Sequence, residues 1–173
     1  MFKNFTPTYV ARNVYEIDIN KFEKLKVKCI LCDLDNTLDA YYQKTPSPEA
    51  LEFYKRLKEK NIELILTSNN TKSRVSKYAE ELGVKYTYSC RKPLTGRVKK
   101  LLKTLNYSKS DYLIIGDQVF TDVLFANKLK IRSILCDNLV SKDQFFTKIN
   151  KFFDKYIRRY LKKHNKLTNW REI

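Results

Sequence analysis

Four short segments of this chain carry side chains that could do chemistry, and each follows an apolar run typical of a strand. They are, in chain order, residues 33–37 (Asp-Leu-Asp-Asn-Thr), 67–69 (Thr-Ser-Asn), 92–93 (Lys-Pro) and 116–122 (Gly-Asp-Gln-Val-Phe-Thr-Asp). The carboxyl ends of parallel strands share one crevice, so we expect these segments to converge there. Carboxylates that converge repel each other, by roughly 4 kcal/mol for two unit charges about 4 Å apart at an effective dielectric constant near 20. A divalent cation with oxygen ligands relieves this repulsion, and Mg²⁺ is the usual choice.

The same residues form the set of groups that phosphoryl transfer needs. Asp33 and Asp35 are two apart in an extended segment, so one carboxylate can attack a phosphoryl group while the other handles the proton. The other groups are two hydroxyls and a lysine for phosphate oxygens, and two carboxylates for the cation: Thr37, Ser68, Lys92, Asp117 and Asp122. Positioning and charge stabilisation are the main demands of this reaction. The residues therefore predict a Mg²⁺-dependent phosphatase with an aspartate nucleophile.

Apolar runs that read as strands alternate with helical patterns along the chain. Strands are expected at residues 27–32, 62–66, 84–88, 112–115 and 131–135, and helices at 48–60, 71–82, 94–105 and 121–128. Such alternation is typical of a parallel, doubly wound sheet with helices on both faces. We therefore expect an α/β fold, a Rossmann-like three-layer sandwich with a mostly parallel five-stranded sheet in the order 3-2-1-4-5.

Local signals indicate where several helices begin and end. Ser47 followed by Pro48 predicts a helix start, because serine caps the free N–H groups and proline suits the first helical position. Gly83 predicts the end of the helix that precedes it. Asn20 is expected to cap a short helix, with Glu23 completing a capping box.

The four segments, taken together and in this order, resemble the motifs of the haloacid-dehalogenase superfamily over residues 27–137. Asp33-x-Asp35-x-Thr37 is similar to the first motif, Ser68 to the second, Lys92 to the third, and Gly116-Asp117 with Asp122 to the fourth. The resemblance departs from the pattern at Asn36, where many relatives have glycine. This departure removes no catalytic group.

The resemblance implies a role for each residue. Asp33 would be the nucleophile that forms a phospho-aspartyl intermediate, and Asp35 would be the general acid and then the base for water. Phosphate would be bound by Thr37, Ser68, Asn69 and Lys92, with Lys92 balancing its charge. Mg²⁺ would be held by Asp33, the main-chain carbonyl of Asp35 and Asp117, and Asp122 would act on it through water.

A closer resemblance concerns the residues around these motifs. Residues 33–38, 67–70, 91–93, 116–118 and 121–122 are similar to the capless phosphatases of subfamily IIIA, and within it to relatives of phosphatidylglycerophosphate phosphatase. Residues 39–47 and 69–91 are too few to hold a cap domain. The resemblance thus implies an open site and phosphatidylglycerophosphate as the substrate, in phospholipid biosynthesis. We expect one phosphatase domain over residues 1–173, with an N-terminal extension (1–26), a catalytic core (27–137) and a C-terminal helix (143–163).

The composition favours an anionic partner in a reducing compartment. The formal net charge is +16 over 173 residues, which favours phosphorylated substrates, nucleic acid or an anionic membrane. No run is long and apolar enough for a transmembrane helix, and no signal pattern is seen, so a cytoplasmic location is expected. Cys29 and Cys32 form a C-x-x-C pair, but side chains alternate along a strand. We expect them to point to opposite faces as buried hydrophobic residues.

The C-terminal segment reads as a basic amphipathic helix. Its apolar stripe is formed by Phe145, Ile149, Phe152, Tyr156 and Tyr160, widened by Phe146, Phe153, Ile157 and Leu161. The cations on the other side are Lys148, Lys151, Lys155, Arg158, Arg159 and Lys162. This pattern is typical of a helix that lies on an anionic membrane, which would make the protein peripheral at the inner face. The stripe could equally pack on the sheet or on a second subunit, and both interpretations stay open here.

Other function classes remain as alternatives. One is a phosphatase for a soluble phosphometabolite or a nucleic-acid end, to which basic charge would guide a polyanion. Because the sequence has no RNA-stacking motif and no recognition helix, nucleic acid is not an expected partner. The other is a non-enzymatic module that binds partners through a phosphate site. The sequence carries no signal of oligomeric state.

Overall fold

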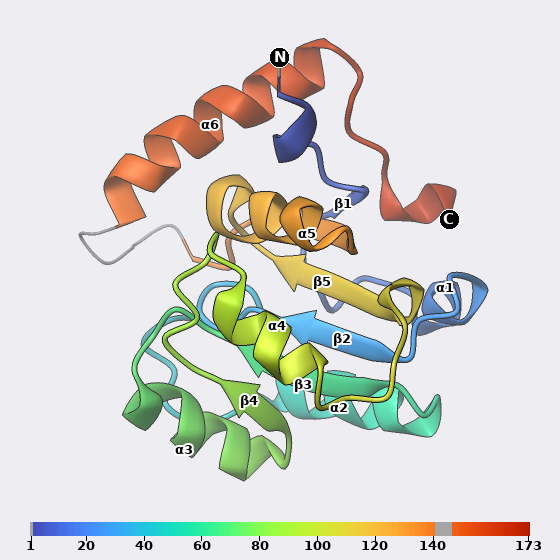
Figure 1. Ribbon diagram of the computed structural model, residues 1–173, viewed down its shortest axis with the longest axis vertical. Coiled ribbons are helices and arrows are strands. Elements are labelled where there is room, and N and C mark those ends of the chain that lie inside the picture. The colour runs from blue at the N-terminus through green and yellow to red at the C-terminus, as the bar shows by residue number, and fades with distance from the viewer. Residues whose placement is uncertain (1, 141–146) are drawn as a thin grey trace.

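In the part of the chain that the structure describes, six parallel strands form one sheet (Figure 1). The computed structural model describes residues 2–140 and 147–173. The strands are β1 (Tyr9–Ala11), β2 (Cys29–Cys32), β3 (Glu63–Thr67), β4 (Lys85–Thr87), β5 (Tyr112–Gly116) and β6 (Arg132–Cys136). Their order is β1-β6-β5-β2-β3-β4, so the predicted order 3-2-1-4-5 corresponds to β4-β3-β2-β5-β6 and is confirmed. The predicted number of strands was wrong, because the short β1 adds to the outer edge of β6.

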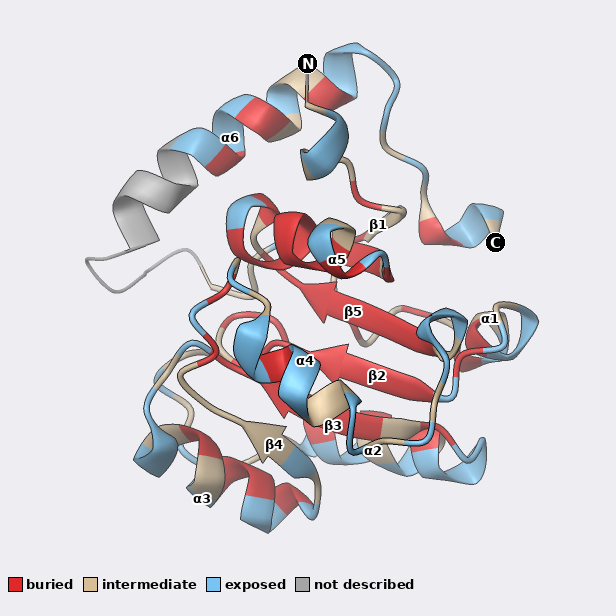
Figure 2. Cartoon of the chain, in the orientation of Figure 1, coloured by how far each residue is buried: buried red, intermediate tan, exposed pale blue. Residues whose placement is uncertain are grey.

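Helices cover both faces of the sheet, as the three-layer prediction requires. They are α1 (Ile19–Lys24), α2 (Pro48–Glu59), α3 (Lys72–Leu82), α4 (Gly96–Leu102), α5 (Leu124–Leu129) and α6 (Thr147–Lys163). The first three pack on one face against strand residues such as Ile30 and Leu64. Helices α4 and α5 pack on the other face against residues such as Leu31 and Ile114. Figure 2 shows the consequence, buried central strands between helices whose outer sides are exposed.

The helix ends follow the local signals in two of three places. The Ser47 hydroxyl accepts a hydrogen bond from the Ala50 N–H at 3.2 Å, and α2 begins at Pro48. Gly83 ends α3 in the left-handed conformation, with φ +77°. The predicted cap of α1 was wrong: Asp18 is the cap and accepts from the N–H of Asn20. Asp18 precedes the helix and is therefore placed to accept, whereas Asn20 is already helical.

The cysteines are buried and free. Cys29 packs with the core on the α4 and α5 face, and Cys32 with the core on the opposite face. Cys90 and Cys136 are also buried, and all four are free thiols. The prediction that Cys29 and Cys32 point to opposite faces is confirmed.

Helix α6 packs on β6 and on residues 119–123 through part of its apolar stripe. Ile157 and Leu161 are buried against Val119, Val123 and Leu135. The packing interpretation therefore holds for these two positions. Residues 143–146 of the predicted helix lie outside the described residues. Within the described ranges, no helix is long and apolar enough to cross a membrane.

Candidate active site

Three of the predicted site residues directly follow parallel strands. Asp33 follows β2, Ser68 follows β3 and Asp117 follows β5. In the sheet register Cys32 lies opposite Ile115, and the Asp33 N–H donates to the Ile115 carbonyl at 2.9 Å. The strands therefore end level with one another and bring these side chains to one edge of the sheet.

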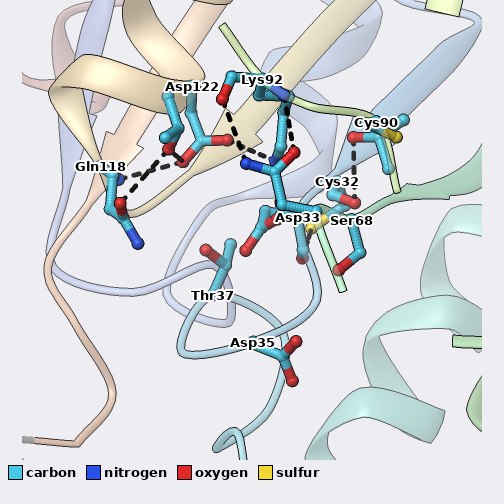
Figure 3. Close-up of polar contacts among 12 residues, drawn as sticks. Cys32, Asp33, Asp35, Thr37, Ser68, Cys90, Lys92, Gln118 and Asp122 are labelled. Atoms are coloured by element: carbon cyan, nitrogen blue, oxygen red, sulfur yellow. Dashed lines mark hydrogen bonds and ion pairs between the residues drawn. The ribbon is translucent and has the colours of Figure 1, made fainter. Parts of the chain in front are cut away.

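Lys92 joins two carboxylates at the centre of this edge (Figure 3). Its Nζ donates to Oδ1 of Asp33 and to Oδ1 of Asp122, both at 2.6 Å. Only 2% of the Lys92 side chain is exposed. Burial alone would lower the pKa of Lys92, but the carboxylates of Asp122 and Asp33 outweigh it and raise the pKa. The lysine is therefore held as an ammonium ion.

Carboxylates outnumber this lysine. Burial raises the pKa of Asp33 to about 7, with Lys92 acting against the rise and Asp122 adding to it. Burial also raises the pKa of Asp117 well above its ordinary range, and Asp33 and Asp122 add to that rise. One ammonium among three buried carboxylates leaves an excess of negative charge.

The residues present fit a hard divalent cation. Oδ1 of Asp117 accepts from the Thr37 hydroxyl at 3.1 Å, but Oδ2 is buried without a hydrogen-bond partner in the described part of the chain. Such an orphaned acceptor is unfavourable unless a ligand completes it. Among the residues that the structure describes, no three His, Cys, Asp or Glu side chains are grouped to hold a metal. The ligands expected for Mg²⁺ include only two such side chains, those of Asp33 and Asp117, because the third ligand is the main-chain carbonyl of Asp35.

A left-handed turn shapes the loop after β2. Asn36 has φ +67°, a conformation that asparagine tolerates better than most residues and glycine adopts freely. This explains why asparagine can stand where many relatives have glycine. The Asn36 N–H donates to the Asp39 carbonyl at 2.6 Å, and the Asp39 carboxylate accepts from Tyr78 at 2.5 Å and from the Ser47 N–H at 2.9 Å. Asp39 thus anchors the loop, a role that the sequence analysis missed.

Asp35 lies apart from the group formed by Asp33, Lys92 and Asp122 (Figure 3). Its carboxylate accepts from Arg74 at 2.9 Å and from the side-chain amide of Asn70 at 3.1 Å. The structure therefore brings Asp35 to the same rim but pairs it with α3. Arg74 was not singled out from the sequence, since an arginine inside a helix carries no local signal.

Ser68 and Asn69 occupy the loop after β3. The Ser68 hydroxyl oxygen accepts from the Asn70 N–H at 3.0 Å. The Asn69 side chain accepts from the Lys92 N–H at 2.7 Å and donates to the Lys92 carbonyl at 3.1 Å. Asn69 therefore positions the backbone of Lys92. Its predicted contact with phosphate stays a prediction.

The loop after β5 allows Asp122 to approach the sheet closely. A Cβ at Gly116 would lie 2.3 Å from Cγ of Asp122, so only glycine fits there. The expected helix at 121–128 is a π-helical turn, η3 (Val119–Val123), followed by α5. Single π-helical turns are frequent at functional sites. The second oxygen of Asp122 accepts from the Gln118 N–H at 3.1 Å, so both of its oxygens have protein partners.

Comparison with known proteins identifies the family. A profile described as haloacid dehalogenase-like hydrolase matches residues 18–130. The chain is 32% identical over 170 residues to the "Probable phosphatase YqeG" of Bacillus subtilis (strain 168), and the match covers 98% of each protein. The chain belongs to the haloacid dehalogenase-like hydrolases. The predicted superfamily is thereby confirmed.

Solved structures place this hydrolase in the expected fold. The 3-deoxy-D-manno-octulosonate 8-phosphate phosphatase from Yersinia pestis is 13% identical, with a TM-score of 0.52 over 69% of this chain and 77% of that one. The hypothetical protein XCC2798 from Xanthomonas campestris is 16% identical, with a TM-score of 0.52 over 70% of each chain. At such identities the likeness concerns the fold alone.

Helix α6 of this hydrolase supplies two residues that the sequence analysis did not assign to the site. Asp154 accepts from the Val119 N–H at 2.5 Å, at the start of η3. Arg158 donates to the main-chain carbonyls of Asp117 at 2.6 Å and Cys136 at 2.9 Å. Arg158 was expected among the cations on the side opposite the apolar stripe. Its i,i+4 spacing from Asp154, with which it forms an ion pair at 3.0 Å, was the only available signal.

Proposed function

We propose that this hydrolase is a Mg²⁺-dependent phosphatase that cleaves phosphomonoesters through an aspartyl-phosphate on Asp33. The phosphatase class follows from the family and from the relative that is 32% identical. The finer proposal rests on one arrangement. Lys92 lies 2.6 Å from both Asp33 and Asp122, beside the unpaired Oδ2 of Asp117. Positive charge held by buried groups is what stabilises a transferring phosphoryl group.

The carboxylates of Asp33 and Asp35 would divide the chemistry between them. Asp33 attacks phosphorus and the ester P–O bond breaks, while the leaving oxygen takes the proton of Asp35. Water then attacks the phosphorus of phospho-Asp33 and the P–O bond to Asp33 breaks, while the Asp35 carboxylate takes a proton from this water. One water is consumed, and an alcohol and inorganic phosphate are released. Asp35 must turn away from Arg74, its partner at 2.9 Å, to reach the leaving oxygen.

The phosphoryl oxygens would be bound by the hydroxyls of Ser68 and Thr37 and by Lys92. Asn69 keeps Lys92 in place through its two main-chain hydrogen bonds. Asp33, the Asp35 carbonyl and Asp117 would hold Mg²⁺, which would supply positive charge against the phosphoryl oxygens. Asp122 orients Lys92 and would reach the cation only through water.

The proposed substrate is phosphatidylglycerophosphate, which a capless enzyme would bind at the cytoplasmic membrane surface. A capless site is supported by the segment between β2 and α2, which has only an isolated bridge, Asp35 with Asp39. Exposed aromatic side chains lie on η3 and α6: Phe120 is 37% exposed, Phe153 53% and Tyr156 61%. Exposed aromatics on a basic helix suit a surface of anionic lipid. An open site beside such a surface can accept a headgroup that stays in its membrane.

The experiment is phosphate release from phosphatidylglycerophosphate in mixed micelles, beside soluble phosphoesters and a 3′-phosphorylated oligonucleotide. Each reaction is run with Mg²⁺, with EDTA, and with the Asp33→Asn variant. Preference for the lipid that is lost with EDTA and in the variant supports the proposal. Activity confined to the soluble esters or to the oligonucleotide would discard the lipid substrate and keep the phosphatase.

A further inference from the structure

A groove of about 500 Å³ lies between α6 and the ends of β5 and β6. One wall is the helix, with Asp154, Lys155, Arg158, Arg159 and Lys162; the other walls are Gln118, Asp137, Asn138 and Leu167. All of these residues belong to the described part of the chain. The proposed mechanism uses none of the groove's exposed cations.

The groove adjoins the loop after β5, which holds Asp117 and Asp122. Gln118 directly follows Asp117, and the Gln118 N–H donates to Oδ2 of Asp122 at 3.1 Å. Arg158 donates to the Asp117 carbonyl at 2.6 Å from the helix side. A molecule whose phosphomonoester reaches Asp33 could therefore extend into this groove.

Both acidic residues of the groove already have a cationic partner. Asp154 pairs with Arg158 at 3.0 Å, and Asp137 pairs with the same guanidinium at 3.2 Å. One cation thus serves both carboxylates.

Three further cations face the groove without a carboxylate partner. Lys155, Arg159 and Lys162 are exposed and are spaced i, i+4 and i+7, so they form one stripe along α6. No ion pair of these three side chains is recorded among the described residues. Like charges at i,i+4 repel each other, and a bound anion removes this repulsion.

We propose that this groove binds a second anionic group of the substrate. The substrate class is then a phosphomonoester that carries a phosphodiester or a carboxylate group some distance from the scissile phosphate. This inference rests on the proposed phosphatase activity but not on a lipid substrate, since the cations recognise charge and not acyl chains.

The kinetic test compares substrates with one and with two anionic groups. The single-anion substrates are glycerol 3-phosphate and para-nitrophenyl phosphate. The two-anion substrates are glycerophosphoglycerol phosphate, which carries a phosphodiester, and 3-phosphoglycerate, which carries a carboxylate. The groove variant is Lys155→Ala/Arg159→Ala/Lys162→Ala. The matched control, Lys99→Ala/Lys100→Ala/Lys103→Ala, removes three exposed charges at α4.

The groove variant is expected to lower the ratio of kcat/KM for two-anion over single-anion substrates by about tenfold or more, which is the loss of ~1.4 kcal/mol of binding. The control variant keeps the wild-type ratio. Whichever two-anion substrate shows the loss identifies the phosphodiester or the carboxylate as the group bound. An unchanged ratio overturns the inference, and so does a variant that only loses binding to phosphatidylglycerol vesicles.

A binding measurement keeps this test separate from the proposed activity. Glycerophosphoglycerol has the phosphodiester but no phosphomonoester, and glycerate has the carboxylate alone. One of them should shift the NMR signals of the Gln118 and Asn138 side-chain amides in the wild type and not in the groove variant. If the wild type hydrolyses no substrate, the proposed function fails. The NMR shifts alone then decide whether the groove binds an anionic group. Absence of shifts with both probes contradicts the proposal that the groove binds a second anionic group.

Discussion

The guanidinium of Arg158 donates a hydrogen bond of 2.6 Å to the main-chain carbonyl of Asp117. This contact joins a C-terminal helix to the residue that we expect to hold the cation. The same guanidinium binds the Cys136 carbonyl at 2.9 Å and Asp154 at 3.0 Å. The helix therefore supports the loop that follows β5.

Replacing Arg158 should weaken metal binding more than it weakens turnover. Partners that orient a metal ligand typically contribute about 10–100-fold in metal affinity. We expect Arg158→Ala to raise the Mg²⁺ concentration for half-maximal activity within that range, with much of kcat recovered at saturating Mg²⁺. Lys163→Ala, an exposed change on the same helix, is the control. An Arg158→Ala enzyme with wild-type Mg²⁺ dependence would remove Arg158 from this role.

A side chain at Gly116 should displace Asp122. Since a Cβ would lie 2.3 Å from Cγ of Asp122, Gly116→Ala must push the carboxylate away from Lys92. We expect a loss of about 1–3 kcal/mol in the free energy of unfolding, together with most of the activity. Gly96→Ala has open space around it and should change stability by no more than about 1 kcal/mol. Denaturant unfolding and activity assays check both, and equal behaviour of the two variants would contradict the account.

The stability of the protein in EDTA should depend on the titration of Asp33. Burial raises the pKa of Asp33 from its ordinary 3.8 to about 7, so the folded state binds this proton more tightly than the unfolded state. The stabilising contribution is therefore complete below pH 4 and is lost as the pH rises to about 7, with a slope of at most about 1.4 kcal/mol per pH unit. Asp33→Asn should lack this component. Urea unfolding between pH 4 and pH 8 measures the difference, and parallel curves for the two proteins would show that Asp33 is not so perturbed.

Asp35→Asn should slow the cleavage of esters with poor leaving groups more than the cleavage of esters with good leaving groups. A general acid contributes typically about 10²–10⁴-fold when the leaving group is an alkoxide. With para-nitrophenyl phosphate the first step needs no acid, so a burst of para-nitrophenol should survive although turnover falls. Stopped-flow absorbance measures the burst. An equal loss of the first step on glycerol 3-phosphate and on the aryl ester would speak against Asp35 as the acid.

The sequence predicted most of the sheet because its strands are buried and apolar. The order of β4-β3-β2-β5-β6 followed from their alternation with helices. Strand β1 was not predicted, because its three residues lie in a mixed aromatic segment and are too few to show the pattern of a strand. The motif residues could be placed at one edge because each comes directly after a strand.

Contacts between distant segments could not be predicted in the same way. Arg74 meets Asp35 across 39 positions, and Arg158 meets Asp117 across 41. Both arginines lie on helices where a cation usually faces solvent. Only the packing of α3 and α6 on the sheet turns them toward the site.

The central claim is that Asp33 carries the phosphoryl group, and trapping the intermediate tests it most directly. The enzyme is mixed with Mg²⁺ and a phosphomonoester, quenched in acid during turnover, and treated with borohydride, which reduces an acyl phosphate to an alcohol. Peptide mass spectrometry should then find homoserine at position 33, and none when Mg²⁺ is omitted. Turnover with an unmodified Asp33, or a reduced residue elsewhere, would contradict the account.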